Sequence, residues 1–206
     1  GDVCRKSDVA NVLENIGAMP LKGIFHCAGI LRDGVLSQQS VAKFKEVLAP
    51  KIQGTQVLHE CSCHLNLDYF VLFSSTASLL GSPGQANHAA ANAYQDSFAA
   101  MRVLLGLPAI SIHWGPWSKV GAATRDGIEK NIYEHGLRFL DPFIALRLLE
   151  NALSCGETEV GAFNADYERL TQRLRSPLLK LVESGPIQPK SYPSIEQAPG
   201  VQNCSS

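Results

Sequence analysis

Apolar positions along the chain fall into short and long segments that alternate. The short segments are almost uninterrupted apolar runs, and they predict strands at Leu21–Cys27, Leu67–Phe73, Ala109–Trp114 and Glu159–Phe163. The long segments repeat apolar residues at helical spacing, and they predict helices at Ser7–Ile16, Ser40–Cys63, Gln85–Leu105 and Pro142–Leu153. Strands without polar alternation are typical of a parallel sheet that helices cover on both faces. The pattern therefore predicts an α/β fold.

Several residues mark where these elements begin or bend. Ser7 and Asp141 are expected to cap the first and last predicted helices, because a short polar side chain at that position bonds a free backbone N–H. Pro50 lies inside the second predicted helix and is expected to kink it.

The start of the chain departs from a complete nucleotide-binding fold. Such a fold opens with a strand, a glycine-rich turn and a helix that holds a pyrophosphate. No segment of this kind is present, and Gly1–Val3 is typical of a strand end followed at once by a helix. We therefore expect a Rossmann-like, doubly wound parallel sheet that lacks its first β-α-β segment in this chain. After Leu181 the composition changes to Pro, Ser, Gln and Gly, so residues 1–175 are predicted to fold and 176–206 to form a linker or disordered tail.

Composition excludes several classes of partner. Eighteen basic residues against nineteen acidic ones leave a formal charge of −1, so we expect no nucleic-acid partner. No apolar run approaches the ~20 residues that a bilayer helix needs, so we expect no membrane partner. The six cysteines form no C-x-x-C pair, and Cys61, Cys63 and His64 lack a second ligand pair. We expect free thiols, no metal centre and a cytoplasmic location.

Candidate chemistry gathers near one end of the predicted sheet. Ser74 and Ser75 follow the second predicted strand, and ligands of α/β sheets collect outside the carboxyl ends of the strands. Lys51 lies on the preceding helix. His88 and Asn92 are four residues apart and therefore share one face of an alanine-rich helix.

Several independent motifs resemble the ketoreductase domain of modular polyketide synthases, which belongs to the extended short-chain dehydrogenase/reductase family. They are Phe73–Asn87 with Ala89–Ala93, His26–Gly29, Leu48–Lys51 and Ile112–Trp117, and the resemblance extends over Gly1–Leu170. It implies the C-terminal, catalytic part of such a domain. The domain would use NADPH to reduce a β-ketoacyl thioester to the β-hydroxyacyl form. The expected partners are the acyl carrier protein that carries the chain on phosphopantetheine, the N-terminal half of the reductase and other synthase domains.

The resemblance also implies roles for single residues. Ser75 matches the serine that bonds the substrate carbonyl, Lys51 the lysine that supports the proton relay, and Asn92 the asparagine that completes it. A hydroxyl, a cation and an amide directed at one oxygen would stabilise an alkoxide. The implied cofactor contacts are Asp2, Val3, Ala28, Gly29, Lys51, Gly115, Pro116 and Trp117. Each residue also has a structural interpretation: Ser75 as a turn cap, Lys51 as a solvated helix residue, Asn92 as a backbone contact and Asp2 as a helix cap.

His88 departs from the family pattern. The family places its catalytic tyrosine thirteen residues after the serine, and here that position is His88. Tyr94 cannot replace it, because six residues along a helix turn the side chain to another face. Three interpretations follow. In the first, a His88 imidazolium with an ordinary pKa of ~6.5 acts as the acid. In the second, the histidine ring ends short of the place of a tyrosine hydroxyl, which leaves a weak or inactive domain. In the third, His88 is a packed residue in a reductase-derived structural or docking domain.

Three further residues concern the stereochemistry of the product. Asp33 matches the diagnostic second aspartate of a family motif, in the stretch Leu31–Asp33, and Leu80 takes the position where the other stereochemical type has tryptophan. With Pro83, they imply a B-type domain that forms the D-alcohol. A lone aspartate in a loop is also typical of a simple turn.

Overall fold

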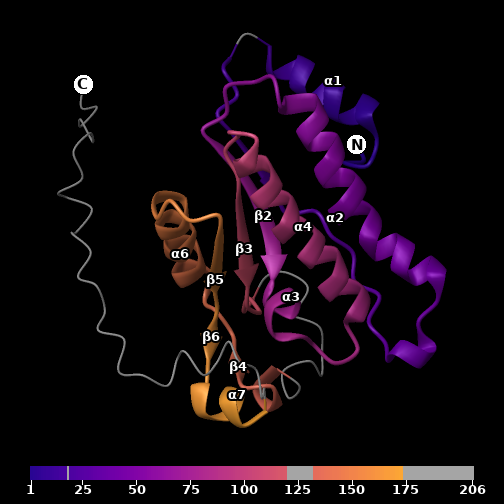
Figure 1. Ribbon diagram of the computed structural model, residues 1–206, viewed down its shortest axis with the longest axis vertical. Coiled ribbons are helices and arrows are strands. Elements are labelled where there is room, and N and C mark those ends of the chain that lie inside the picture. The colour runs from indigo at the N-terminus through magenta and orange to yellow at the C-terminus, as the bar shows by residue number, and fades with distance from the viewer. Residues whose placement is uncertain (18, 120–131, 174–206) are drawn as a thin grey trace, which may run out of the picture.

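The computed structural model describes residues 1–17, 19–119 and 132–173. The described helices are α1 (Lys6–Ile16), α2 (Val41–Ser62), α3 (Thr76–Leu80), α4 (Ala86–Leu104), α6 (Pro142–Ser154) and α7 (Tyr167–Arg173), with a 3-10 helix η1 at Leu36–Gln38. The strands are β1 (Gly23–His26), β2 (Tyr69–Ser75), β3 (Ile110–Trp114), β4 (Leu137–Arg138), β5 (Glu159–Ala162) and β6 (Asn164–Ala165). Figure 1 shows their arrangement.

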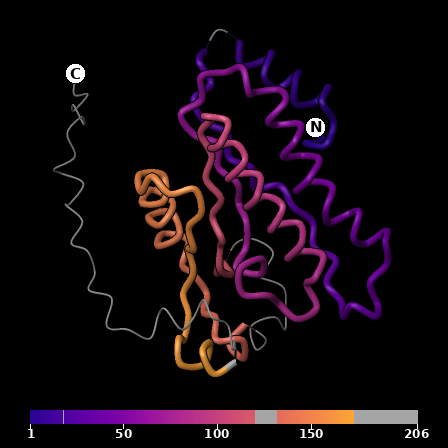
Figure 2. The backbone as a smooth tube through the Cα atoms, in the orientation of Figure 1, coloured from indigo at the N-terminus to yellow at the C-terminus, as the bar shows by residue number. Residues whose placement is uncertain are grey.

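Four of the strands form one parallel sheet in the order β1-β2-β3-β5. In its register Val71 lies opposite Ile110 and Ser75 lies opposite Trp114. Helices α2 and α4 lie on one side of this sheet and α6 on the other, as the ribbon and the tube both show (Figures 1 and 2). A second, two-stranded sheet pairs β4 with β6 in antiparallel fashion. The predicted α/β fold with a helix-covered parallel sheet is confirmed.

The two faces of the sheet carry separate apolar clusters. Phe70 and Leu72 of β2 are buried with Phe98 of α4, whereas Val71 is buried in the cluster that contains Ala145 of α6. Successive residues of a strand point to opposite faces. Since both faces are covered, consecutive positions are apolar, and each fully buried large side chain contributes roughly 1.5–3 kcal/mol. This burial accounts for the uninterrupted apolar runs in the sequence.

The N-terminal segment differs from the prediction. Gly1–Val3 do not form a strand end, because the carbonyl oxygen of Asp2 accepts the N–H of Arg5 at 2.9 Å and the chain turns directly into α1. The N-cap of α1 is Arg5, whose side chain makes no capping bond. Ser7 lies inside the helix, so the predicted Ser7 cap is wrong.

The Asp141 cap was predicted correctly, and Pro50 lies inside a helix, as predicted. Asp141 caps α6, with its carboxylate accepting the N–H of Phe143 at 2.9 Å. Pro50 lies inside α2, but the helix continues through it to Ser62. The Pro50 carbonyl oxygen lies 2.9 Å from Nε2 of the buried His26, which joins α2 to the end of β1.

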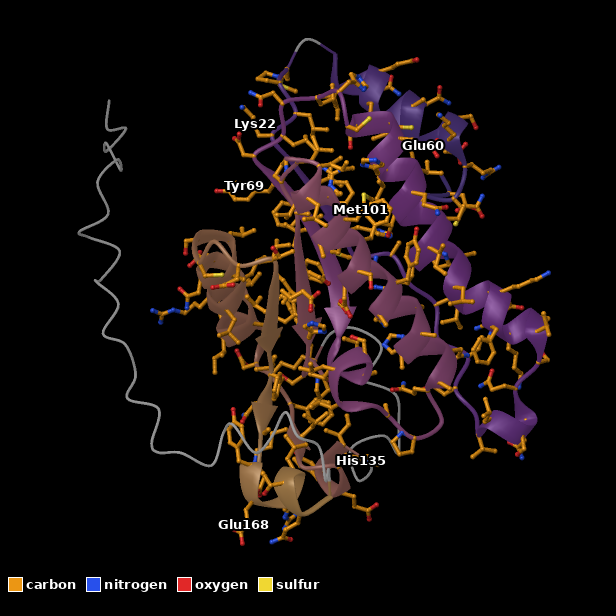
Figure 3. All side chains as sticks on the ribbon, viewed as in Figure 1. Lys22, Glu60, Tyr69, Met101, His135 and Glu168 are labelled. Atoms are coloured by element: carbon orange, nitrogen blue, oxygen red, sulfur yellow. The ribbon has the colours of Figure 1, made fainter. Side chains whose placement is uncertain are left out.

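The expectations about membranes, metals, cysteines and the C-terminal tail are compared here with the described residues. None of the helices in the described ranges is long and apolar enough to cross a bilayer. Within the same ranges, no cluster of histidine, cysteine and carboxylate side chains is suited to a metal ion, and the described cysteines are free. Exposed charged residues such as Lys22, Glu60 and Glu168 lie at the periphery (Figure 3). The predicted boundary at residue 175 and the tail at 176–206 lie outside the described residues.

Candidate active site

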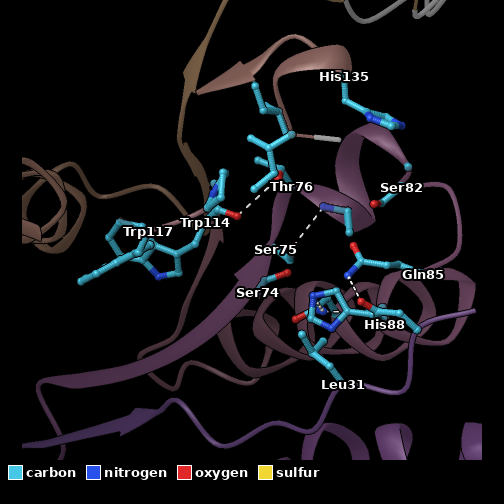
Figure 4. A pocket seen from close by; sticks show the side chains of 18 of the residues that line it. Leu31, Ser74, Ser75, Thr76, Ser82, Gln85, His88, Trp114, Trp117 and His135 are labelled. Carbon is cyan, nitrogen blue, oxygen red and sulfur yellow. Dashed lines mark hydrogen bonds between the residues drawn. The ribbon is translucent and has the colours of Figure 1, made fainter. Parts of the chain in front are cut away.

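A cavity of about 360 Å³ opens at the carboxyl ends of β2 and β3 (Figure 4). It brings together the four predicted catalytic residues, Lys51, Ser75, His88 and Asn92. Of the other predicted site residues, Asp33, Pro83, Gly115, Pro116 and Trp117 also line it. Residues from three helices, the sheet and its loops thus face one space, as expected for an α/β fold.

Ser75 is both the last residue of β2 and the N-cap of α3. Its Oγ accepts the backbone N–H of Ala77 at 3.1 Å. A hydroxyl that accepts one hydrogen bond keeps its own hydrogen for another acceptor. The capping role therefore does not compete with donation by Ser75 into the cavity.

Lys51 is buried in α2 and not solvated. The residue is 5% exposed, and its Nζ donates to the carbonyl oxygen of Phe73 at 2.5 Å. Burial lowers the pKa of the ammonium to about 8, while Cys27 and Asp96 act in the opposite direction. Burial of this group contradicts the interpretation of Lys51 as a solvated helix residue. At neutral pH it remains a cation, with a pKa close to the working range of a proton donor.

His88 and Asn92 bond to each other within α4. Asn92 Nδ2 donates to the His88 carbonyl oxygen at 2.8 Å and lies 3.2 Å from His88 Nε2. Since an amide nitrogen only donates, Nε2 acts as the acceptor, and this network assigns the ring hydrogen to Nδ1. Asn87 Oδ1 accepts the His88 backbone N–H at 2.8 Å. Asn92 therefore sets both the place and the tautomer of the ring.

The His88 ring is neutral at pH 7. Burial, followed by the nearby Lys51 ammonium, lowers its pKa to about 4, and Asp33 only partly opposes this. The expected imidazolium acid with an ordinary pKa is therefore wrong for this environment. A neutral imidazole still carries one N–H, which can bond a developing negative charge.

Two polar atoms of cavity-lining residues are buried without a partner among the described residues. They are Asn92 Oδ1, an acceptor, and Trp114 Nε1, a donor. Buried polar groups are nearly always bonded, so such a pair fits a polar ligand. Trp114 also packs between Phe73 and Trp117, with ring centroids 5.4 and 5.0 Å away. These rings give this side of the cavity an aromatic wall.

The loop that contains Asp33 is attached to the start of α4. Asp33 Oδ2 accepts Nε2 of Gln85 at 3.1 Å, and the Gly34 N–H donates to the Gly84 carbonyl oxygen at 2.8 Å. Asp33 and Gln85 both line the cavity, whereas Leu80 does not. Gln85 was not predicted as a site residue. Its position at the start of the helix that carries His88 indicates that it lies near the site.

Four predicted cofactor contacts lie outside the cavity lining. They are Asp2, Val3, Ala28 and Gly29. The Asp2 carboxylate accepts the Cys4 N–H at 2.9 Å in the turn before α1, so Asp2 does not cap that helix, whose N-cap is Arg5. Gly29 adjoins Lys51, because a Cβ at Gly29 would lie 3.2 Å from Lys51 Cε. Ile132, His135 and Leu137 line the cavity and were not predicted, since no periodic pattern marked that segment.

Tyr94 points away from this site, as predicted. Its hydroxyl accepts Nε2 of Gln56 on α2 at 2.9 Å, and its ring packs beside Phe98.

Comparisons with known proteins agree with this architecture. The model of the KR domain matches residues 1–119. The polyketide synthase GfsA of Streptomyces halstedii is 41% identical over 163 residues, which are 77% of this chain and 2% of that protein. A solved A-type ketoreductase from a modular polyketide synthase is 34% identical with a TM-score of 0.80, covering 82% of this chain and 36% of that one.

A second solved structure extends the comparison. The ketoreductase from the first module of phoslactomycin biosynthesis in Streptomyces sp. HK803 is 29% identical with a TM-score of 0.81, covering 89% of this chain and 44% of that one. The chain thus spans less than half of the length of these two solved chains. The chain belongs to the ketoreductase (KR) domain family of polyketide synthases.

Proposed function

We propose that this chain is the catalytic part of a domain that reduces the β-keto group of an acyl thioester to an alcohol, with NADPH as the reductant and an acyl carrier protein as the carrier of the substrate. The observation that carries the proposal is the convergence of the Ser75 hydroxyl, the Lys51 ammonium and the His88 imidazole on one cavity. These groups suit an oxygen atom that gains negative charge during the reaction.

The residues present fit the nicotinamide end of the cofactor. Trp114 and Trp117 offer aromatic surface on which a nicotinamide ring would lie, and the unpartnered Trp114 Nε1 could donate to a polar group of the cofactor. Lys51, which lines the same cavity, would offer its ammonium to a hydroxyl of the cofactor. When bound, NADPH would supply the hydride that the carbonyl carbon accepts. Contacts to its pyrophosphate are assigned to the N-terminal half of the domain, where the family carries its glycine-rich turn.

The chain's own residues would then handle the oxygen and its proton. Ser75 donates its hydroxyl hydrogen to the carbonyl oxygen, and His88 donates from Nδ1 as a neutral imidazole. In other enzymes, too, a histidine with a lowered pKa polarises a substrate carbonyl by donating a hydrogen bond as a neutral imidazole. Lys51, with its pKa of about 8, gives the proton that converts the alkoxide to the alcohol. Asn92 is a positioning residue, because both hydrogens of its amide are directed at His88.

The experiment compares the full-length protein that contains this chain with its His88→Tyr variant. A β-ketoacyl thioester and NADPH are supplied, and loss of the reduced nicotinamide absorbance is followed. We expect slow turnover in the parent and faster turnover in the variant, because a phenol restores the usual donor of the family. Lys51→Met should lower the rate by roughly 100-fold or more, the usual contribution of a proton donor, whereas Lys45→Met, on the exposed side of the same helix, should leave it unchanged.

A second candidate function is a catalytically weak or inactive structural or docking domain. The neutral His88 side chain, which is shorter than the tyrosine of the family pattern, favours this second candidate. No turnover in the parent with strong turnover in His88→Tyr would support this alternative and reject the first. If the parent is active, the B-type assignment predicts the D-alcohol, and chiral chromatography of the product tests it. The placement of Asp33 on the cavity supports that assignment.

A further inference from the structure

A line of polar side chains crosses the face of the sheet that α4 covers. In the register of the parallel strands, Ser74 of β2 lies opposite His113 of β3, and Ser111 of β3 lies opposite Glu159 of β5. Ser74, His113 and Ser111 are all buried. The polar stretch adjoins the apolar cluster of Phe70 and Leu72 on the same face.

These side chains make a continuous series of contacts. Ser74 Oγ lies 3.3 Å from Ser78 Oγ, and Ser78 Oγ lies 3.1 Å from Nδ1 of His113. On the other side of the ring, Nε2 of His113 lies 3.5 Å from a carboxylate oxygen of Glu159. Asp96 of α4 also faces the ring, with Oδ2 3.7 Å from Nδ1. These contacts between Ser74 and Glu159 are within, or close to, hydrogen-bond distance.

The two ends of the series lie in different environments. Ser74 lines the cavity that holds Lys51, and Nζ of Lys51 bonds the carbonyl oxygen of the neighbouring residue, Phe73. At the other end, the Glu159 side chain is 46% exposed. His113, between them, is 4% exposed. The series therefore runs from the cavity, through the interior, to solvent.

Packing alone does not call for this arrangement. Burying a hydroxyl or an imidazole is unfavourable unless it is bonded, and apolar residues would fill the same space at no such cost. The opposite face of the sheet is filled in that way, by residues such as Val71 and Ile112. An imidazole can accept a proton on one nitrogen and release one from the other, which makes histidine a common proton shuttle.

We propose that Ser74, Ser78, His113 and Glu159 form a proton path that resupplies Lys51 from solvent. The proposal rests on the proposed function, because Lys51 needs a new proton only after it has protonated an alkoxide. Cofactor and acyl chain would fill most of the cavity and separate Lys51 from bulk solvent, whereas the path through the sheet face stays open.

The transfer is balanced at every group. Glu159 takes a proton from water and passes it to Nε2 of His113, while Nδ1 of His113 releases its proton to Ser78 Oγ. Ser78, whose hydroxyl donates to the Ser75 carbonyl oxygen at 2.8 Å at rest, turns and passes its hydrogen to Ser74. Ser74 releases one to a water in the cavity, which would carry it to the neutral Lys51 amine. No electron moves, and each relay group ends with the number of protons it had at the start.

The test uses the full-length protein with NADPH and a β-ketoacyl thioester. Ser78→Ala interrupts the path and Glu159→Gln removes its outer acid. Ser97→Ala and Glu157→Gln are matched controls, because both residues are exposed outside the path. In dilute buffer we expect kcat to fall about tenfold in both path variants, with KM unchanged, a loss smaller than that of the direct proton donor. Added imidazole, a small proton carrier, should restore kcat in Glu159→Gln, whose exposed outer acid it can replace, but not in Ser78→Ala, whose break lies in the interior; the parent and controls should stay unchanged.

The outcomes separate the possible failures. Path variants as fast as the parent would overturn the proposal, and so would a loss in Glu159→Gln that imidazole does not restore, because that loss reflects altered structure. Thermal unfolding of each variant identifies the latter case. If the parent itself reduces no thioester, the proposed function fails together with the path. An active parent with unaffected variants rejects the path alone.

Discussion

The protonation state of His88 decides which acid the site can use, and it can be measured directly. Burial and the Lys51 ammonium lower the pKa of the ring to about 4. At pH 7 the ring is then protonated in about one molecule in a thousand, and protonating it costs about 4 kcal/mol, since one pKa unit corresponds to about 1.4 kcal/mol. Lys51, with a pKa of about 8, is charged in about nine molecules of ten at the same pH.

An NMR titration of this chain with isotope-labelled histidine rings tests this reasoning. The His88 signal is identified by its loss in His88→Gln. We expect no titration of His88 between pH 8 and about 5.5, because its pKa lies well below that window. In Lys51→Met the pKa of His88 should rise, since a neighbouring cation is removed, but it should stay below the ordinary value because burial remains.

Two results would refute the reasoning. A His88 signal that titrates near pH 6.5 in the parent would restore the imidazolium as the acid. An unchanged His88 titration in Lys51→Met would mean that the lysine charge does not act on the ring. In the full-length protein, the rate of reduction should decline as pH rises through about 8, when Lys51 loses its proton, with no decline near pH 6.5.

Two other predictions concern stability. The folded pKa of both His26 and His88 is about 4, below the ~6.5 of an unfolded histidine. Between these values the unfolded chain binds protons that the folded chain does not, so the free energy of unfolding should fall as pH falls from 6.5 to 4, by up to about 3 kcal/mol for each histidine. Urea unfolding at pH 7 and pH 4.5 measures this, and a flat dependence would contradict it. Gly115→Ala places a Cβ 2.7 Å from the Cβ of Phe163, so it should destabilise the fold by roughly 1–3 kcal/mol. Thermal unfolding should show this loss reduced in a Phe163→Ala background, and an equal loss in both backgrounds would rule out that contact as the cause.

Most strands and helices of the fold were predicted from the local pattern of apolar and polar residues. The four predicted strands and the helices between them appear within a few residues of their expected bounds, because a strand covered on both faces must be apolar at consecutive positions. The short elements α3, α7, β4 and β6 were not predicted, because so few residues carry no periodic pattern. At the N-terminus, Asp2 donates its N–H to the Asp8 carboxylate and accepts the Arg5 N–H, and these bonds turn the chain into α1 where a strand end was expected.

The sequence by itself determined the α/β class and the family, because periodicity and motif spacing are local properties of the chain. Only the tertiary structure decided the charges at the site. Whether Lys51 and His88 are buried depends on elements far apart in sequence, and burial sets their pKa values. The same holds for the line from Ser74 to Glu159, since its contacts form only when three strands and α3 align side by side.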